Sequence, residues 1–92
     1  MIKSFAEKRT RALFETGKSR RWNSIARVAV RKLVQIDSAT TLEELSAPPG
    51  NRLEALKGDR GGQHRIRISD RWRICSRWEG DGVYGVEIVD YH

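Results

Sequence analysis

The sequence predicts an α+β fold in which two N-terminal helices pack on a small, twisted antiparallel β-sheet. Residues 6–16 are rich in helix formers, and between residues 23 and 39 apolar residues recur at spacings of three and four, as on one face of a helix. From residue 53 onward apolar and polar residues alternate, which is typical of strands with one buried face. A chain of 92 residues has room for one hydrophobic core, so we expect residues 1–92 to form a single domain.

The first helix should follow a short extended segment. Residues 2–5 alternate in polarity and are expected to form a short first strand, and residues 6–16 a helix with Leu13 on its inner side. Gly17 is expected to end this helix, because glycine adopts the left-handed conformation without a Cβ clash.

The second helix has the clearer pattern. It should begin at a capping Asn23 or Ser24, whose side chain accepts from the first free N–H groups, and end near Ala39. Its apolar stripe comprises Ile25, Val28, Ala29, Leu33 and Ile36. The basic residues off that stripe, which we expect to be solvated, are Arg27, Arg31 and Lys32.

Two short signals follow the second helix. Thr41 and Glu44 have the spacing of a capping box, which predicts a brief helical turn. Residues 48–50, Pro-Pro-Gly, exclude regular structure and predict a loop.

Face parity fixes the expected strand pairing. A three-residue loop at residues 69–71 pairs Ile66 with Ile74 and thereby separates apolar from basic side chains, whereas a two-residue loop would mix them. A five-residue loop at residues 79–83 continues the pattern and sets Ile88 beside Ile74. In the last strand the residues expected on one face are Tyr84, Val86 and Ile88. The arginines expected on the opposite, open face of the sheet are Arg65, Arg67, Arg73 and Arg77.

Composition narrows the class of protein. The net charge of +6 favours nucleic acid, an acidic protein or an anionic membrane surface as partner. There is no apolar run long enough to span a bilayer and no signal-peptide core, so we expect a cytoplasmic protein without a membrane partner. Cys75 is the only cysteine, which excludes an intrachain disulfide, and with His64 and His92 it forms no zinc pattern, so no metal or other cofactor is expected.

The open face is a candidate anion site, because a guanidinium group matches phosphate with two parallel hydrogen bonds. RNA is the anion that we favour. The alternative is a solvated face whose arginines pair with Asp and Glu of neighbouring strands, and the pattern alone favours this alternative. Glu87 falls on the open face and can neutralise one arginine.

The sequence ends with an acid, a phenol and an imidazole: Asp90, Tyr91 and His92. The apolar residues just before them predict that the triplet lies at the end of a strand. Histidine exchanges a proton near neutral pH more readily than other side chains. The alternative, which a terminal triplet alone favours, is that Tyr91 packs at the sheet edge and His92 is a frayed end.

Four segments bear on this choice: Leu-Lys-Gly-Asp-Arg at 56–60, Gly-Gln-His-Arg-Ile-Arg-Ile at 62–68, Trp-Arg-Ile-Cys-Ser-Arg-Trp at 72–78 and Val-Glu-Ile-Val-Asp-Tyr-His at 86–92. Together they resemble the HigB-type toxins of the RelE/ParE superfamily, which are the toxins of type II toxin–antitoxin modules. Length, element order and basic charge extend the resemblance over the whole chain. It implies a RelE-like fold and a ribosome-dependent mRNA endonuclease that acts on codons in the A site of the 70S ribosome. It also implies a HigA-type antitoxin with a helix-turn-helix domain, through which alone the toxin would reach operator DNA.

The motif carries over to Lys57, Arg73, Asp90, Tyr91 and His92, and Glu54 stands where some relatives have a histidine. RNA cleavage without metal needs the ribose 2′-hydroxyl deprotonated, the phosphorane charge stabilised and the 5′-oxygen protonated. Under the resemblance, Arg73 and Lys57 stabilise the phosphorane by the logic of an oxyanion hole.

The remaining roles follow in the same way. Asp90 or Glu54 is a candidate base, His92 a candidate acid, and Tyr91 stacks on or orients an unstacked base. The arginines left to bind RNA are Arg65, Arg67 and Arg77.

Two other functions stay open from the sequence. One is a non-catalytic basic module that binds RNA or DNA, and the other is a ParE-like toxin that targets gyrase. The terminal Asp-Tyr-His argues against the gyrase toxin, and loss of His92 would distinguish a nuclease from a binding module.

Overall fold

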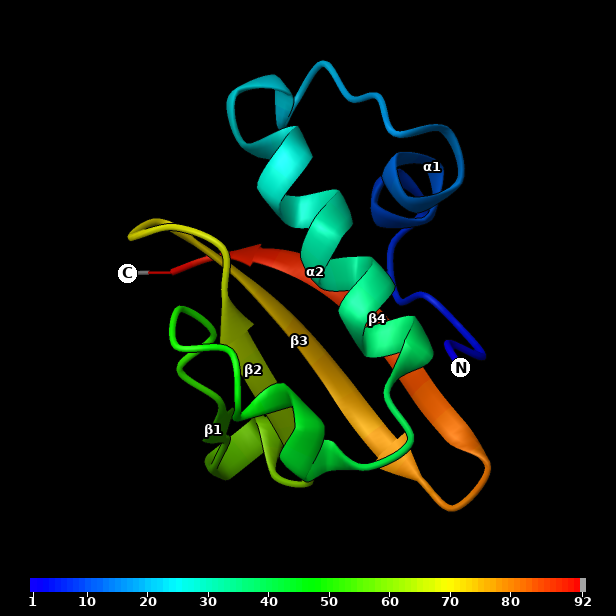
Figure 1. The fold of residues 1–92 in the computed structure, drawn as a ribbon, viewed down its shortest axis with the longest axis vertical. Coiled ribbons are helices and arrows are strands. Elements are labelled where there is room, and N and C mark those ends of the chain that lie inside the picture. Colours follow the sequence, from blue (N-terminus) through cyan, green and yellow to red (C-terminus); the bar gives the residue numbers. More distant parts are fainter. Residues whose placement is uncertain (92) are drawn as a thin grey trace.

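A computed structural model describes residues 1–91. Two helices, α1 (Lys8–Thr16) and α2 (Ala26–Ser38), precede a four-stranded antiparallel sheet, and α2 lies across one face of it (Figure 1). The strands are β1 (Glu54–Ala55), β2 (Gln63–Arg67), β3 (Trp72–Glu79) and β4 (Gly82–Asp90). They lie in the order β1-β2-β3-β4, so the sheet is a meander, and the predicted α+β class with two helices on an antiparallel sheet is confirmed.

Short 3₁₀ turns join these elements. They are η1 (Asn23–Ile25), η2 (Leu42–Leu45) and η3 (Gly58–Arg60). The capping box that predicted the second turn is present, since the Thr41 and Glu44 side chains each bond to the other residue's backbone. No helix within residues 1–91 combines the length and the apolarity needed to span a bilayer.

The start of the chain runs along β4 instead of forming a strand of its own. Ile2 and Phe5 make isolated parallel bridges to Val83 and Val86. Helix α1 begins at Lys8, two residues later than predicted, because the Glu7 carboxylate caps it by accepting from the Thr10 N–H at 2.7 Å. Gly17 ends the helix as predicted, with φ of 75° and its N–H donating to Leu13 O.

Helix α2 ends at Ser38 with Ala39 as its C-cap, which agrees with the predicted end near Ala39, but the prediction that Asn23 or Ser24 caps its start was wrong. Both residues lie inside the 3₁₀ turn η1, so Ile25 occupies the cap position and no side chain accepts from the first N–H groups. The apolar stripe packs as expected, with Ala29, Leu33 and Ile36 buried.

Lys32 contradicts the expected solvated face of α2. Its side chain is folded into the protein and the residue is only 5% exposed. The periodicity of the helix could not predict this position, because Lys32 reaches carbonyl groups of residues far along the chain.

The register of the first hairpin is as predicted. Ile66 lies opposite Ile74 and Arg67 opposite Arg73, and Ile74 lies opposite Ile88. Ile66 and Ile74 are buried beneath the helices together with Val86 and Leu33, so the predicted separation of apolar and basic faces is realised.

The second hairpin differs from the prediction. Its turn has two residues, Gly80 and Asp81, because Glu79 already pairs with Gly82. The register is restored by a bulge, in which Gly85, with φ of 63°, is the extra residue of β4. Val83 therefore enters the core, and Tyr84 turns to the open face opposite Arg77 instead of sharing a face with Val86.

A substitution at Gly82 tests whether residues 1–5 pack on β4. A Cβ at this position would lie 2.8 Å from Met1 O and 2.6 Å from Lys3 Cγ. We expect Gly82→Ala to lower the free energy of unfolding by about 1–3 kcal/mol, as overpacking does. Urea denaturation measures the loss.

Gly80→Ala is the matched control, since a Cβ there would meet nothing within 4 Å. Both changes restrict the unfolded chain alike, so the difference between the two variants reports the contact. Equal stability of the two variants would show that the segment does not dock as described.

Candidate functional site

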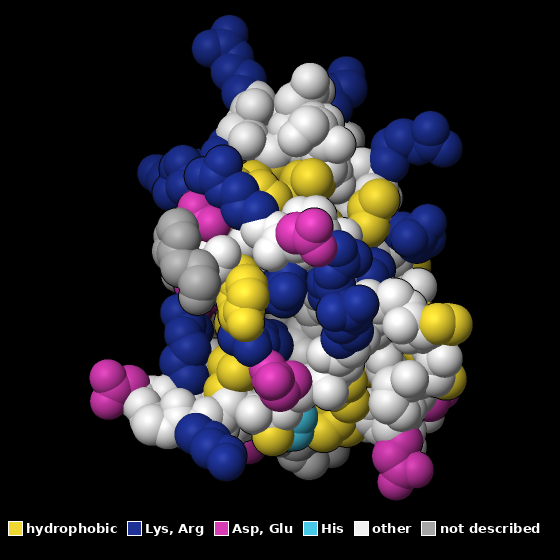
Figure 2. Space-filling model, turned by 90° about the vertical axis from the view of Figure 1, so that its left-hand side faces the viewer, with side chains coloured by type: hydrophobic (Ala, Val, Ile, Leu, Met, Phe, Trp, Pro, Cys, Tyr) yellow, Lys and Arg dark blue, Asp and Glu magenta, His cyan; other side chains and the backbone are white. Residues whose placement is uncertain are grey.

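A pocket of about 440 Å³ lies on the open face of the sheet, where β4 ends. Its wall combines η3 and the residues before it with β2, β3 and the end of β4. The lining residues are Leu56, Lys57, Asp59, Arg60, Arg65, Cys75, Val89, Asp90 and Tyr91. Figure 2 looks at the side of the molecule where the chain ends, and Lys and Arg side chains gather there with Asp and Glu among them.

A larger hollow, of about 620 Å³, lies at the loop between α1 and η1. It is lined by Gly17, Lys18, Ser19, Arg20, Asn23 and Ala26. None of the predicted site residues that the structure describes lines it. We therefore take the smaller pocket, which has acid, base and phenol side chains together, as the candidate site.

The Tyr91 ring lies between two arginines. The guanidinium carbon of Arg73 is 4.2 Å and that of Arg65 is 4.5 Å from the ring centroid. The backbone fixes this position, because the Tyr91 N–H donates to Arg71 O at 2.6 Å. Cation–π attraction thus holds two positive groups close together at the mouth of the pocket.

Most arginines of this region have an acidic partner, so the alternative of a paired arginine face describes them well. The ion pairs are Arg60–Glu87, Arg65–Glu54, Arg67–Asp70, Arg71–Asp90 and Arg77–Glu79. Arg67 holds the pKa of Asp70 below its usual value. Exposed pairs of this kind contribute little to stability, and they weaken the electrostatic attraction of an arginine for an anion.

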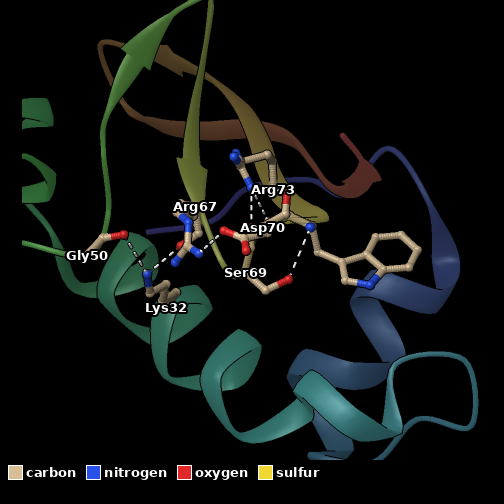
Figure 3. Close-up of polar contacts among 7 residues, drawn as sticks. Lys32, Gly50, Arg67, Ser69, Asp70 and Arg73 are labelled. Carbon is tan, nitrogen blue, oxygen red and sulfur yellow. Dashed lines mark hydrogen bonds and ion pairs between the residues drawn. The ribbon is translucent and has the colours of Figure 1, made fainter. Parts of the chain in front are cut away.

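Arg73 is the exception among the arginines on the open face. Its Nη1 donates to Ser69 O and, at 3.3 Å and 3.2 Å, to Asp70 O and Trp72 O (Figure 3). Within residues 1–91 it forms no ion pair with a carboxylate. Burial, and then the neighbouring Arg65 and Arg67, lower its pKa, although an arginine stays charged at neutral pH. Its charge is therefore oriented by carbonyl groups without being neutralised.

Asp90 lines the pocket and is held by Arg71. The guanidinium of Arg71 donates through Nε to both carboxylate oxygens at 3.2 Å and through Nη2 to Oδ2 at 3.0 Å. These hydrogen bonds raise the pKa of Arg71. The sequence predicted Arg71 only as part of the turn. The pairing of its neighbour Trp72 with Asp90 places Arg71 beside the Asp90 carboxylate.

The other predicted residues are distributed as follows. Lys57 is exposed and lines the pocket, whereas Glu54 lies in β1 and reaches the site only through its ion pair with Arg65. Arg77 lies four residues beyond Arg73 on β3, roughly 13 Å along the strand, and packs on Tyr84. His92 lies outside the described residues.

Five residues that line the pocket were not predicted as site residues: Leu56, Asp59, Arg60, Cys75 and Val89. Arg60 bonds to Gln63 at 3.0 Å and to Glu87 at 3.3 Å, and its position after the Lys-Gly-Asp segment was the available signal. Cys75 is 2% exposed, and burial raises the pKa of its thiol. A thiol kept protonated in this way fits the predicted packing role better than that of a nucleophile.

Comparison with known proteins decides the family. A family model described as the RelE-like toxin of the type II toxin–antitoxin system HigB matches residues 3–92. The chain belongs to this toxin family. A type II toxin has an antitoxin partner, so this toxin is one half of a two-protein module.

Two curated relatives are similar over their full length. Toxin HigB-1 of Vibrio cholerae serotype O1 is 34% identical over 94 aligned positions, which cover 100% of this toxin and 98% of the relative. Endoribonuclease HigB of Proteus vulgaris is 36% identical over 94 positions, which cover 100% of both chains. The predicted family is thus confirmed, and the roles of single residues stay predictions.

The stacking of Tyr91 predicts a measurable coupling. In a double-mutant cycle of Tyr91→Leu and Arg65→Met, the coupling in the free energy of unfolding should be about 0.5–1 kcal/mol, as expected for an exposed cation–π pair. Pairing Tyr91→Leu with Arg77→Met should give none, because Arg77 stacks on Tyr84. Equal coupling in both cycles would contradict the described position of the ring.

Proposed function

We propose that this toxin is a metal-independent endoribonuclease, which cleaves mRNA in the A site of the 70S ribosome and so inhibits translation. The observation that carries the proposal is the Arg73 guanidinium, charged and without a carboxylate partner in residues 1–91, beside a pocket lined by Lys57 and Asp90. The printed name of the Proteus vulgaris relative, an endoribonuclease, supports the same activity here.

The reaction is an in-line attack of the ribose 2′-oxygen on the adjacent phosphorus. A base takes the 2′-hydroxyl proton, the new P–O bond forms, and the bond to the 5′-oxygen breaks while an acid protonates the leaving oxygen. The products are a 2′,3′-cyclic phosphate and a 5′-hydroxyl. Arg73 and Lys57 face the extra negative charge of the phosphorane, which is the point at which fixed positive groups accelerate the reaction most.

The base in this proposal is Asp90, in preference to Glu54. Asp90 lines the pocket, and its bidentate contact with Arg71 orients its carboxylate. Glu54 is engaged by Arg65 at the far side of β2. His92, two residues after Asp90, is the proposed acid, and Tyr91 is the surface on which an unstacked base lies.

The partners follow from the family. We infer that the antitoxin is HigA-type with a helix-turn-helix domain, and that operator DNA is bound only through it. In this proposal the toxin works in the cytoplasm, and residues 1–92 act as one RelE-like domain. Arg65 and Arg67, next to Arg73 on the sheet, are the proposed contacts to the RNA backbone.

The substitution Arg73→Ala tests whether the Arg73 guanidinium stabilises the transition state. Loss of one transition-state contact of this kind costs roughly 10²–10³ in rate, so mRNA cleavage should fall by that factor with little change in melting temperature. Primer extension on mRNA in a translating lysate measures the cuts, with wild type and variant at equal concentration.

Arg77→Ala removes the same charge roughly 13 Å away along β3 and should lose much less activity. If both variants lose activity equally, the arginines act through net charge alone. If wild-type protein binds ribosomes and produces no cuts, the toxin is not an endoribonuclease.

Deletion of His92 tests the proposed acid. General acid catalysis contributes about 10²–10⁴-fold, so the deletion should nearly abolish cleavage. The melting temperature should stay close to that of wild type, since the deletion leaves the buried Val83, Val86 and Ile88 of β4 in place. His92→Gln keeps the chain length and should be similarly impaired. A deletion variant that cuts mRNA like wild type would remove His92 from the mechanism.

A further inference from the structure

Lys32 is a buried cation in a helix whose other basic residues are exposed. Its Nζ leaves the α2 surface and donates to Arg67 O and, at 3.3 Å, to Gly50 O (Figure 3). Burying an ammonium group is costly unless it is hydrogen-bonded, and burial, followed by Arg31, Arg67 and Arg73, lowers the pKa of Lys32.

The contact completes a clamp on the backbone of one residue, Arg67, at the end of β2. The Arg67 N–H donates to Asn51 O at 2.6 Å, and its carbonyl accepts from Lys32. Asn51 is itself fully buried, and its side-chain amide donates to Leu45 O at 3.0 Å. Helix α2 and the loop at residues 48–52 therefore fix both sides of the Arg67 backbone.

From Arg67 the constraint passes to Arg73. The Arg67 side chain pairs with Asp70, and the Arg73 guanidinium donates to the carbonyls of Ser69 and Asp70 (Figure 3). The same turn is closed by the Trp72 N–H, which donates to Ser69 Oγ at 3.2 Å. The turn between β2 and β3 thus supplies the carbonyl groups that orient the Arg73 guanidinium. The backbone at the start of this turn is held by the hydrogen bond from Lys32 to Arg67 O.

We propose that Lys32 is a positioning residue for the Arg73 guanidinium: it clamps the end of β2 and the following turn so that Arg73 points at the phosphate. This inference rests on the proposed endoribonuclease function. Lys32 itself touches no RNA in this arrangement. It acts through the Arg67 peptide, which distinguishes it from the arginines of the open face.

The kinetic test compares Lys32→Met with Arg31→Met, its exposed neighbour on α2, on ribosomes programmed with mRNA. A small misplacement of a catalytic group can cost up to about 100-fold, so Lys32→Met should lower kcat by about 10–100-fold with KM little changed. In an Arg73→Ala background the same change should cost less than about 2-fold, because the group that it positions is gone. An equal loss in both backgrounds, or a kcat like that of Arg31→Met, would overturn the proposal.

A second measurement needs no ribosome. The Nε–Hε NMR signal of Arg73, assigned by its absence in Arg73→Ala, should shift or broaden in Lys32→Met and stay in place in Arg31→Met. An unchanged Arg73 signal in folded Lys32→Met would contradict the proposal. Should Lys32→Met not fold, Lys32→Leu, which also has no donor for the Arg67 carbonyl, goes through both measurements with the same criteria. Absence of mRNA cleavage by wild type overturns the proposed function, and the NMR comparison then decides separately whether Lys32 holds Arg73.

Discussion

The antiparallel register of β2 and β3 is the constraint on which both the core and the site depend. Ile66 lies opposite Ile74, and Arg67 lies opposite Arg73. Because side chains alternate along a strand, a slip of one residue would turn the arginines toward the helices and the isoleucines toward solvent. The buried isoleucines under α2 therefore fix the open face of the sheet, and with it the two guanidinium groups that hold the Tyr91 ring.

Electrostatics then divides this face into two kinds of arginine. The positive charge of those paired with carboxylates, such as Arg67 with Asp70 and Arg77 with Glu79, is partly neutralised within the protein. Arg73 is oriented by backbone carbonyls, which carry partial charges and leave most of the positive charge of a guanidinium uncompensated. A phosphate is therefore expected to gain most at Arg73. The interpretation as a paired, solvated face describes the other arginines, and the interpretation as an anion site stays a proposal for Arg73.

Sequence spacing predicted those features whose partners are close in sequence. The end of α1 at Gly17, the capping box of Thr41 and Glu44 and the turn between β2 and β3 all depend on residues within a few positions of each other. The prediction from sequence spacing was wrong at the second hairpin, where the Gly85 bulge shifts the register and places Tyr84 on the open face of the sheet. The alternation argument assumes that the two strands pair without interruption. One extra residue in a strand exchanges the faces assigned to the residues on its far side.

The sequence by itself determined the two helices, the β2–β3 register and, through the four segments between residues 56 and 92, the toxin family. Only the tertiary structure decided that Arg71 holds Asp90, that Arg73 has carbonyl partners, and that Lys32 is buried. The physical reason is that the first and the last of these contacts join groups from separate elements, whereas the carbonyls that orient Arg73 converge only through the geometry of the turn before it. Lys32 and Arg67 are 35 positions apart, and no local spacing encodes which charged groups the fold brings within hydrogen-bonding distance.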